Sequence, residues 1–229
     1  MRGDGNGWFR DLDGVRHWGR YGAAGLLLRA PLAESSGCAV LLQLRARGRA
    51  DTRGTWTIPG GACDSHEGPA EAALREAWEE AGIDPREVVI RGERVTTRAL
   101  GGWIFTTVVA DARTALPVRL DHETEAARWV PEAEVAALPL HPDFRRAWPL
   151  LRAQPVYLVL DNGFRASSGR VLPRTVEVAG QGFVWLHRSG EPTGRTARLT
   201  TRPLPFYQRP EDQLLLHADQ VFPGSAASP

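Results

Sequence analysis

The chain has 229 residues, of which 42% are hydrophobic, and its formal net charge is +1. That apolar fraction is sufficient for a buried core, and the near-neutral charge excludes a general electrostatic attraction to nucleic acid or to anionic membranes. Cys38 and Cys63 are the only cysteines, and their spacing excludes a disulfide framework or a cysteine-based metal site, as is typical of a reducing cytosol. Because no run of 18 apolar residues exists, we expect a cytoplasmic protein that does not enter a membrane.

The chain begins with a polar segment, residues 1–19, that is rich in glycine, arginine and aspartate. We expect an irregular N-terminal arm whose few aromatic side chains pack onto the domain that follows. Two apolar runs, Ala23–Leu28 and Ala39–Leu44, then predict buried strands that pair as a hairpin.

A cluster of arginines follows the second predicted strand. Its members are Arg45, Arg47, Arg49 and Arg53. A guanidinium group can grip a phosphate with paired N–H donors, so this loop either faces the phosphates of a ligand or is an ordinary solvated loop. Arg45 is our candidate substrate-binding residue, because it leaves a strand and therefore has a fixed direction.

A glycine turn and a charged helix come next. Gly60 and Gly61 allow the backbone to turn tightly and to approach a ligand closely. A helix is predicted over residues 69–81, because Pro69 suits the first turn of a helix and Gly82 suits its C-terminal end.

Three glutamates of this predicted helix gather on one arc. The core stripe is expected to hold Ala70, Leu74, Ala77 and Ala81, with Trp78 beside them. Glu76, Glu79 and Glu80 fall on a separate arc about 100° wide, where their charges repel one another and where two of them oppose the helix dipole. A divalent hard cation would offset this repulsion, since Mg²⁺ and Mn²⁺ prefer carboxylate oxygens and water. A solvated acidic face is the alternative.

The stretch Gly61–Ile83, GACDSHEGPAEAALREAWEEAGI, resembles the Nudix box in full. The fixed positions are occupied by Gly61, Glu67, Arg75, Glu76, Glu79, Glu80 and Gly82, and the two aliphatic positions by Ala77 and Ile83. The resemblance is to the MutT-like Nudix hydrolases. It implies an α/β/α sandwich around a mixed sheet, with this loop and helix as the catalytic element. Such enzymes cleave a nucleoside diphosphate linked to another moiety, using Mg²⁺ or Mn²⁺.

The resemblance also implies roles for individual residues. The metal ligands that it implies are the carbonyl of Gly60 and the carboxylates of Glu67, Glu76, Glu79 and Glu80. Glu76 and Glu79 are candidates for the catalytic base within the box. Arg75 is expected to pair with Glu67 and brace the loop against the helix, and an ordinary surface arginine is the alternative reading of Arg75.

The elements after the box complete the predicted sandwich. Strands are expected at Val88–Val95, Trp103–Ala110 and Ala127–Pro131, and helices at Glu132–Leu138 and Asp143–Leu151. An order of strands, box helix, strands and helices suits a mixed sheet between helical layers.

An acidic loop, residues 121–125, precedes the last of these predicted strands. In the family a further carboxylate from this region often completes the metal site or acts as general base. By its spacing to Trp129, Glu123 is the better candidate for this catalytic role and Glu125 is the second. A solvated turn is the alternative.

The resemblance covers roughly residues 20–151, the expected Nudix hydrolase domain. Residues 152–222 are predicted to form a β-rich C-terminal extension with strands at Val156–Leu160, Arg174–Val178 and Phe183–Leu186, and with a strand or short helix at Leu214–Phe222. The extension either shapes the substrate pocket or forms a contact in a homodimer. Residues 223–229 are expected to be a disordered tail.

The expected function is metal-dependent hydrolysis of a small nucleotide. The MutT-like core favours nucleoside triphosphates, including oxidised ones such as 8-oxo-dGTP, with ADP-ribose or another nucleotide-sugar as the runner-up. Trp103, Phe105 and Phe144 are candidates to stack on a base, although aromatic residues often belong to the core.

A Nudix domain that senses nucleotides without cleaving them is the alternative class, against which the complete box argues. The near-neutral charge argues against stable binding of nucleic acid.

Overall fold

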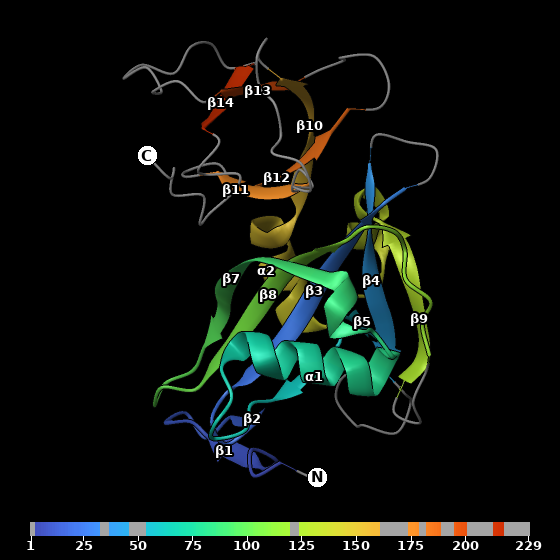
Figure 1. The fold of residues 1–229 in the computed structure, drawn as a ribbon. Coiled ribbons are helices and arrows are strands. Elements are labelled where there is room, and N and C mark those ends of the chain that lie inside the picture. The colour runs from blue at the N-terminus through green and yellow to red at the C-terminus, as the bar shows by residue number, and fades with distance from the viewer. Residues whose placement is uncertain are drawn as a thin grey trace, which may run out of the picture. The chain divides into compact units, whose positions relative to one another are not determined.

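The computed structural model describes residues 3–32, 37–45, 54–119, 124–160, 174–178, 182–188, 195–200 and 213–217. The chain divides into two compact units. The first contains Met1–Pro31 and Cys38–Leu151, and the second contains Leu32–Gly37 and Arg152–Pro229. Figure 1 shows the ribbon of both units.

The first unit begins with a short hairpin of β1 (Trp8–Arg10) and β2 (Arg16–Trp18). The carboxylate of Asp11 closes the turn by accepting hydrogen bonds from the backbone N–H groups of Asp13 at 3.1 Å and Val15 at 2.8 Å. The prediction of a wholly irregular arm is therefore wrong. Strands of three residues are too short to show an alternating pattern, and an aspartate that bonds its own backbone defines the turn.

Seven strands form the main sheet. They are β3 (Ala23–Pro31), β4 (Cys38–Arg45), β5 (Trp56–Thr57), β6 (Gly60–Ala62), β7 (Val88–Arg98), β8 (Ile104–Ala112) and β9 (Thr124–Pro131). The order is β5-β4-β3-β8-β7, and β6 pairs with β3 while β9 pairs with β4. Strands β3 and β8 are parallel and the other pairs are antiparallel, so the sheet is mixed, as expected.

Two helices cover opposite faces of this sheet. Leu26 of β3 packs in one cluster with the buried alanines of α1 (Pro69–Ala81). Arg29 projects to the other face, because side chains alternate along a strand, and its guanidinium donates to the carbonyl of Leu151 at 2.5 Å. Leu151 is the last residue of α2 (Pro142–Leu151). The first unit is therefore an α/β/α sandwich, as expected, with α1 in front of the sheet in Figure 1.

The remaining helices in the described part of this unit are short 3₁₀ helices. They are η1 (Pro85–Glu87) and η2 (Glu132–Ala137). A helix was predicted over residues 132–138, and η2 occupies that position as a 3₁₀ helix that ends at Ala137. The N–H of Leu138 bonds to the carbonyl of Val135 at 3.1 Å, the three-residue spacing that defines a 3₁₀ turn.

The second unit contains a sheet of its own. Its strands are β10 (Ala153–Leu160), β11 (Thr175–Val178), β12 (Gly182–His187), β13 (Thr196–Thr200) and β14 (Gln213–His217), in the order β11-β12-β10-β13-β14. Strand β10 is parallel to β12 and β13, and its buried Val156 packs against Val184 and Leu199 of those strands. A C-terminal sheet is thus present, as expected. The predicted disordered tail, residues 223–229, lies outside the described residues.

The described part of the chain contains no helix that is long and apolar enough to cross a membrane.

Candidate active site

Local sequence sets both ends of helix α1. The N–H of Gly68, before the first turn, donates to the carboxylate of Glu71 at 2.9 Å. At the other end Gly82 has a φ of 67°, a left-handed conformation that favours glycine. Its N–H donates to the carbonyl of Trp78 at 3.0 Å, and the N–H of Ile83 reaches back to Ala77 at 3.2 Å. The helix therefore has the bounds that the sequence predicts.

The buried face of α1 differs from the predicted stripe. Its buried residues are Ala72, Ala73, Ala77 and Ala81. Ala70 and Leu74 are only partly buried, and Trp78 is 54% exposed. The arc that contains Glu76 and Glu80 is turned toward β6 and β4 rather than toward solvent, because both side chains contact those strands. Small alanines on either side of this arc allow the helix to lie close to the sheet.

Two glycines of β6 allow close packing, Gly61 against helix α1 and Gly60 against strand β3. A Cβ atom on Gly61 would lie 2.4 Å from the carboxyl carbon of Glu76, and one on Gly60 would lie 2.5 Å from the carbonyl oxygen of Ala24. Neither glycine has a positive φ. Glycine is therefore required at both positions because there is no room for a Cβ atom, and not because the backbone conformation demands it.

Arg75 is the centre of a network that joins the helix to the box loop (residues 61–68). Its Nε and Nη2 donate to the two carboxylate oxygens of Glu67 at 2.7 and 2.9 Å. Nη1 donates to Glu76 at 2.8 Å and to Glu79 at 3.3 Å, and Nη2 also reaches the carbonyl of Ala62 at 2.8 Å. The structure thus places Arg75 in the bracing position that the family resemblance implies.

The carboxylates of the network differ in their pKa values. Hydrogen bonds from Arg75 hold the pKa of Glu67 below its usual range, and the same bonds raise the pKa of Arg75. Burial raises the pKa of Glu76, and the charges of Glu79 and Glu67 add to this effect. One guanidinium therefore does not fully compensate the carboxylates around it.

Glu80 forms a second connection between α1 and the sheet. Its Oε2 accepts a hydrogen bond from the N–H of Gly60 at 2.8 Å and another from Nε2 of Gln43 at 2.9 Å. Gln43 lies in β4 and is buried. The carboxylate is thus held against the backbone of the glycine turn.

The donor set fits a divalent cation. The groups that would hold the ion are the carbonyl of Gly60 and the carboxylates of Glu67, Glu76, Glu79 and Glu80. Burial, with a smaller contribution from the charges of Glu79 and Glu67, raises the pKa of the half-buried Glu76, and a hard cation beside these carboxylates would stabilise their charged forms. When bound, such an ion neutralises phosphate charge and lowers the pKa of a coordinated water.

A separate cluster lies on the exposed side of the box loop. Ligand atoms of Asp4, Asp64 and His66 lie within 4.8 Å of one another. The carboxylates of this cluster already accept hydrogen bonds from Ser65 and Gly5. We therefore interpret it as a contact between the N-terminal segment and the loop.

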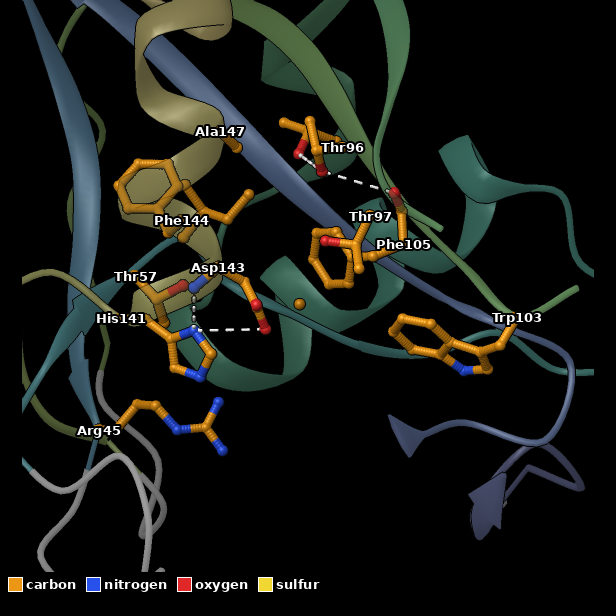
Figure 2. A pocket seen from close by; sticks show the side chains of 13 residues that line it. Arg45, Thr57, Thr96, Thr97, Trp103, Phe105, His141, Asp143, Phe144 and Ala147 are labelled. Atoms are coloured by element: carbon orange, nitrogen blue, oxygen red, sulfur yellow. Dashed lines mark hydrogen bonds and ion pairs between the residues drawn. The ribbon is translucent and has the colours of Figure 1, made fainter. Parts of the chain in front are cut away.

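A pocket of about 560 Å³, partly open to solvent, adjoins the glycine turn (Figure 2). Its lining includes Gly60 and the four residues that the sequence suggests for substrate binding, Arg45, Trp103, Phe105 and Phe144. Gly60 also binds the carboxylate of Glu80. The pocket and the carboxylate cluster therefore share one residue.

His141 and Asp143 form the polar end of this pocket, near Arg45 (Figure 2). The backbone N–H of Asp143 donates to Nδ1 of His141 at 3.2 Å, so in the neutral ring the proton lies on Nε2. Burial lowers the pKa of His141, which keeps the ring neutral at pH 7, and the carboxylate of Asp143 opposes this effect. Asp143 also pairs with Arg146 one turn along α2.

His141 and Asp143 were not among the site residues predicted from the sequence. A usable signal was present, because both precede or begin the predicted helix that carries Phe144. His141 and Asp143 lie within three residues of Phe144, so a helix that places Phe144 at a pocket also brings these two residues close to it.

Aromatic side chains line the pocket from Trp103, which lies at its other end, to Phe144, which lies beside Asp143 and His141 (Figure 2). Trp103 is 8% exposed, and its indole N–H donates to the carbonyl of Gly19 at 2.8 Å. Phe144 packs against Trp148 with ring centroids 5.6 Å apart. Phe105 lies between these two ends in Figure 2. The walls can therefore contact a planar group from more than one side.

The structure describes only part of two predicted site features, the acidic loop and the arginine cluster. Glu123, the first candidate for a general base outside the box, is outside the described residues, as are Arg47, Arg49 and Arg53. Glu125, the second candidate, is exposed and belongs to β9 rather than to a loop. Thr124, at the start of β9, is the register partner of Arg45 in β4, and the register shifts at this point because β9 contains one extra residue, Glu125.

Comparison with known proteins agrees with this geometry. The model of the NUDIX domain family matches residues 22–152, so the chain belongs to the Nudix family, and its relatives identify it as a pyrophosphohydrolase.

Three bacterial proteins illustrate the similarity. A Mycobacterium tuberculosis protein provisionally named 8-oxo-dGTP diphosphatase 3 is 46% identical over 190 residues, which are 81% of this chain and 85% of that protein. A Bifidobacterium longum nucleoside triphosphate pyrophosphatase/Nudix hydrolase fusion protein is 37% identical over 66% of this chain and 31% of its own length. The crystal structure of RenU, a Nudix hydrolase from M. smegmatis, is 47% identical, with a TM-score of 0.60 over 63% of this chain and 91% of RenU.

Proposed function

We propose that the chain hydrolyses purine nucleoside triphosphates with an oxidised base, represented by 8-oxo-dGTP. Water adds to phosphorus, one phosphoanhydride P–O bond breaks, and the products are the nucleoside monophosphate and pyrophosphate. The observation that carries this proposal is the shared position of Gly60, which lines the pocket and also binds Glu80 of the carboxylate cluster. A nucleotide whose base occupies the pocket would have its phosphates beside that cluster.

The charged groups of the site suit a polyphosphate. Arg45 at the rim of the pocket offers guanidinium N–H donors to phosphate oxygens. Glu67 and Glu76 keep Arg75 in place through hydrogen bonds of 2.7 to 2.9 Å, and Arg75 in turn holds the box loop against the helix. The carboxylate cluster then offers the oxygen donors for a divalent ion and a base for the attacking water.

The polar end of the pocket suits an oxidised purine. Guanine carries an acceptor lone pair at N7, whereas 8-oxoguanine carries an N–H donor at N7 between two carbonyl groups. The carboxylate of Asp143 can accept a hydrogen bond from that N–H but repels the N7 lone pair of guanine. The Nε2–H of neutral His141 can donate to an adjacent carbonyl. Phe105 and Phe144 offer aromatic faces for the base.

The relatives support the same substrate class. The name of the M. tuberculosis relative refers to 8-oxo-dGTP, and that protein aligns with 81% of this chain.

A nucleotide panel tests the proposal. We expect kcat/KM for 8-oxo-dGTP to exceed that for dGTP by roughly 10-fold or more, because a hydrogen bond to a charged group contributes about 1.5–3 kcal/mol. Faster hydrolysis of ADP-ribose than of either triphosphate would assign the chain to nucleotide-sugars. Tight binding of nucleotides without hydrolysis in Mg²⁺ would assign it a sensing role.

A further inference from the structure

The N-terminal segment, residues 3–22, interlocks with the box loop. The carboxylate of Asp4 accepts hydrogen bonds from the backbone N–H and the hydroxyl of Ser65 at 2.9 and 2.6 Å. In the opposite direction, the backbone N–H of Gly5 donates to the carboxylate of Asp64 at 2.8 Å in a buried contact. Each partner therefore contributes both a donor and an acceptor.

Glycines make this contact possible. A Cβ atom on Gly3 would lie 1.9 Å from both carboxylate oxygens of Asp64. A Cβ atom on Gly5 would lie 2.0 Å from the carbonyl oxygen of Cys63. Side chains at either position would push the segment away from the loop.

The contact continues to the carboxylate cluster. The backbone N–H of Asp64 donates to Glu67 at 3.1 Å, and the N–H of Glu67 donates back to the carbonyl of Asp64 at 3.1 Å. Glu67 is the bidentate partner of Arg75, which in turn binds Glu76. An unbroken series of hydrogen bonds thus joins Gly5 to the candidate metal ligands.

The other end of the same segment holds the wall of the pocket. The carbonyl of Gly19 accepts the indole N–H of Trp103 at 2.8 Å, and the ring of His17 stacks on that indole with centroids 4.5 Å apart. Asp11 fixes His17 through an oxygen 3.0 Å from Nε2. The N–H of Arg20 bonds to the carbonyl of Gly5 at 2.9 Å, which connects this end of the segment to the first.

We propose that residues 3–22 are a positioning element of the active site. One end fixes the box loop and so places Glu67, together with its partner Arg75, beside the other candidate metal ligands, and the other end orients Trp103 for substrate binding. The proposal rests on the hydrolytic reaction of the Nudix box but does not depend on which nucleotide is the substrate.

The loop contact is tested with Gly5→Ala and Asp4→Ala. We expect amide hydrogen exchange in residues 62–68 of the metal-free protein to rise several-fold, because the loop loses its outer hydrogen bonds. The Mg²⁺ concentration for half-maximal activity should also rise several-fold, and saturating Mg²⁺ should restore most of kcat. Asp13→Ala is the matched control, since Asp13 is an exposed aspartate of the same segment. If Gly5→Ala does not fold, Asp4→Ala decides alone.

The pocket contact is tested with His17→Ala. We expect KM to rise roughly 3- to 10-fold with kcat changed less than about two-fold, from the usual contribution of an aromatic contact. His17→Phe keeps a flat ring on Trp103 and should restore KM.

Three measurements can overturn the proposal: hydrogen exchange in the loop, the Mg²⁺ dependence of activity, and KM. Loop exchange and Mg²⁺ dependence equal to those of Asp13→Ala would remove the first role, and an unchanged KM in His17→Ala would remove the second. Kinetic constants are measured on whichever panel nucleotide the wild-type chain hydrolyses. If it hydrolyses none, the proposed function fails while hydrogen exchange still tests the loop contact.

Discussion

At the scale of single residues, Glu76 shows how the site balances stability against function. Its carboxyl group is covered by Gly61 and by Arg75, and burial raises its pKa above the usual value. At a pH between the pKa values of the unfolded and folded states, the folded state therefore retains a proton that the unfolded state has already released. In the metal-free protein this carboxyl group lowers stability as the pH rises through its raised pKa, and the effect is absent where both states are protonated.

Glu76→Gln should separate these two roles. In EDTA the variant should unfold at a higher urea concentration than wild type at pH 8, because an amide carries no charge and its oxygen still accepts from Arg75. The difference should shrink as the pH falls toward 4.5. Turnover with Mg²⁺ should fall by more than about 100-fold, since even residues that only support metal ligands contribute 10- to 100-fold. A variant that is less stable than wild type at pH 8 would show that the charge of Glu76 stabilises the fold.

Asp143 offers a second prediction at this scale. Asp143→Asn replaces a pure acceptor by a group that can also donate to N7 of guanine. The ratio of kcat/KM for 8-oxo-dGTP over dGTP should therefore fall by roughly 10-fold. Arg146→Ala is the matched control, because it removes the partner of Asp143 on α2 without altering the carboxylate. An unchanged ratio in Asp143→Asn would place base recognition elsewhere.

At the scale of elements, helix α1 shows what a helical pattern can and cannot predict. Its bounds follow from Pro69 and Gly82, because those residues act through local backbone geometry. Its orientation does not follow, since a helical wheel orders side chains without indicating which strands lie beside the helix. Strand β6 approaches the arc that carries Glu76, so Ala73 is buried and Trp78 is exposed.

Packing substitutions on α1 test this orientation. Ala77 is 0% exposed, so Ala77→Leu should lower the free energy of unfolding by about 1–3 kcal/mol through overpacking. Trp78→Ala, one position further along the helix, should change it by less than about 0.5 kcal/mol, as at most surface sites. Urea unfolding of the two variants compares them directly. If Trp78→Ala lowered the free energy of unfolding more than Ala77→Leu does, Trp78 would belong to the core face of the helix, as the helical wheel predicted.

At the scale of the whole molecule, the sequence predicts the elements with strong periodicity and misses the weak ones. The apolar runs of β3 and β4 and the box helix are correctly placed, because their patterns are long. The hairpin of β1 and β2 and strand β13 are missed, since three to five residues with mixed polarity carry little pattern. In the site, the box residues are predicted by the motif. His141 and Asp143 are not, because only the fold brings them to Arg45 and Phe144.

The two units predict a separable Nudix domain. The first unit has its own core and ends at Leu151, and RenU matches 91% of its own length to 63% of this chain. A chain truncated after Ala153 should therefore fold, with a cooperative urea transition and a kcat within about two-fold of the full chain. A truncated chain without a cooperative transition would show that both units form one folding unit.

Release of pyrophosphate from 8-oxo-dGTP is the most direct test of the proposed chemistry. In the presence of EDTA the full chain should show no turnover, and Mg²⁺ or Mn²⁺ should restore it, because the carboxylates of α1 need a cation to act on a polyphosphate. Glu80→Gln should lower the restored rate steeply, since Glu80 is a candidate ligand that contacts Gly60. Full turnover in EDTA, or a normal rate in Glu80→Gln, would contradict a metal-dependent reaction at this helix.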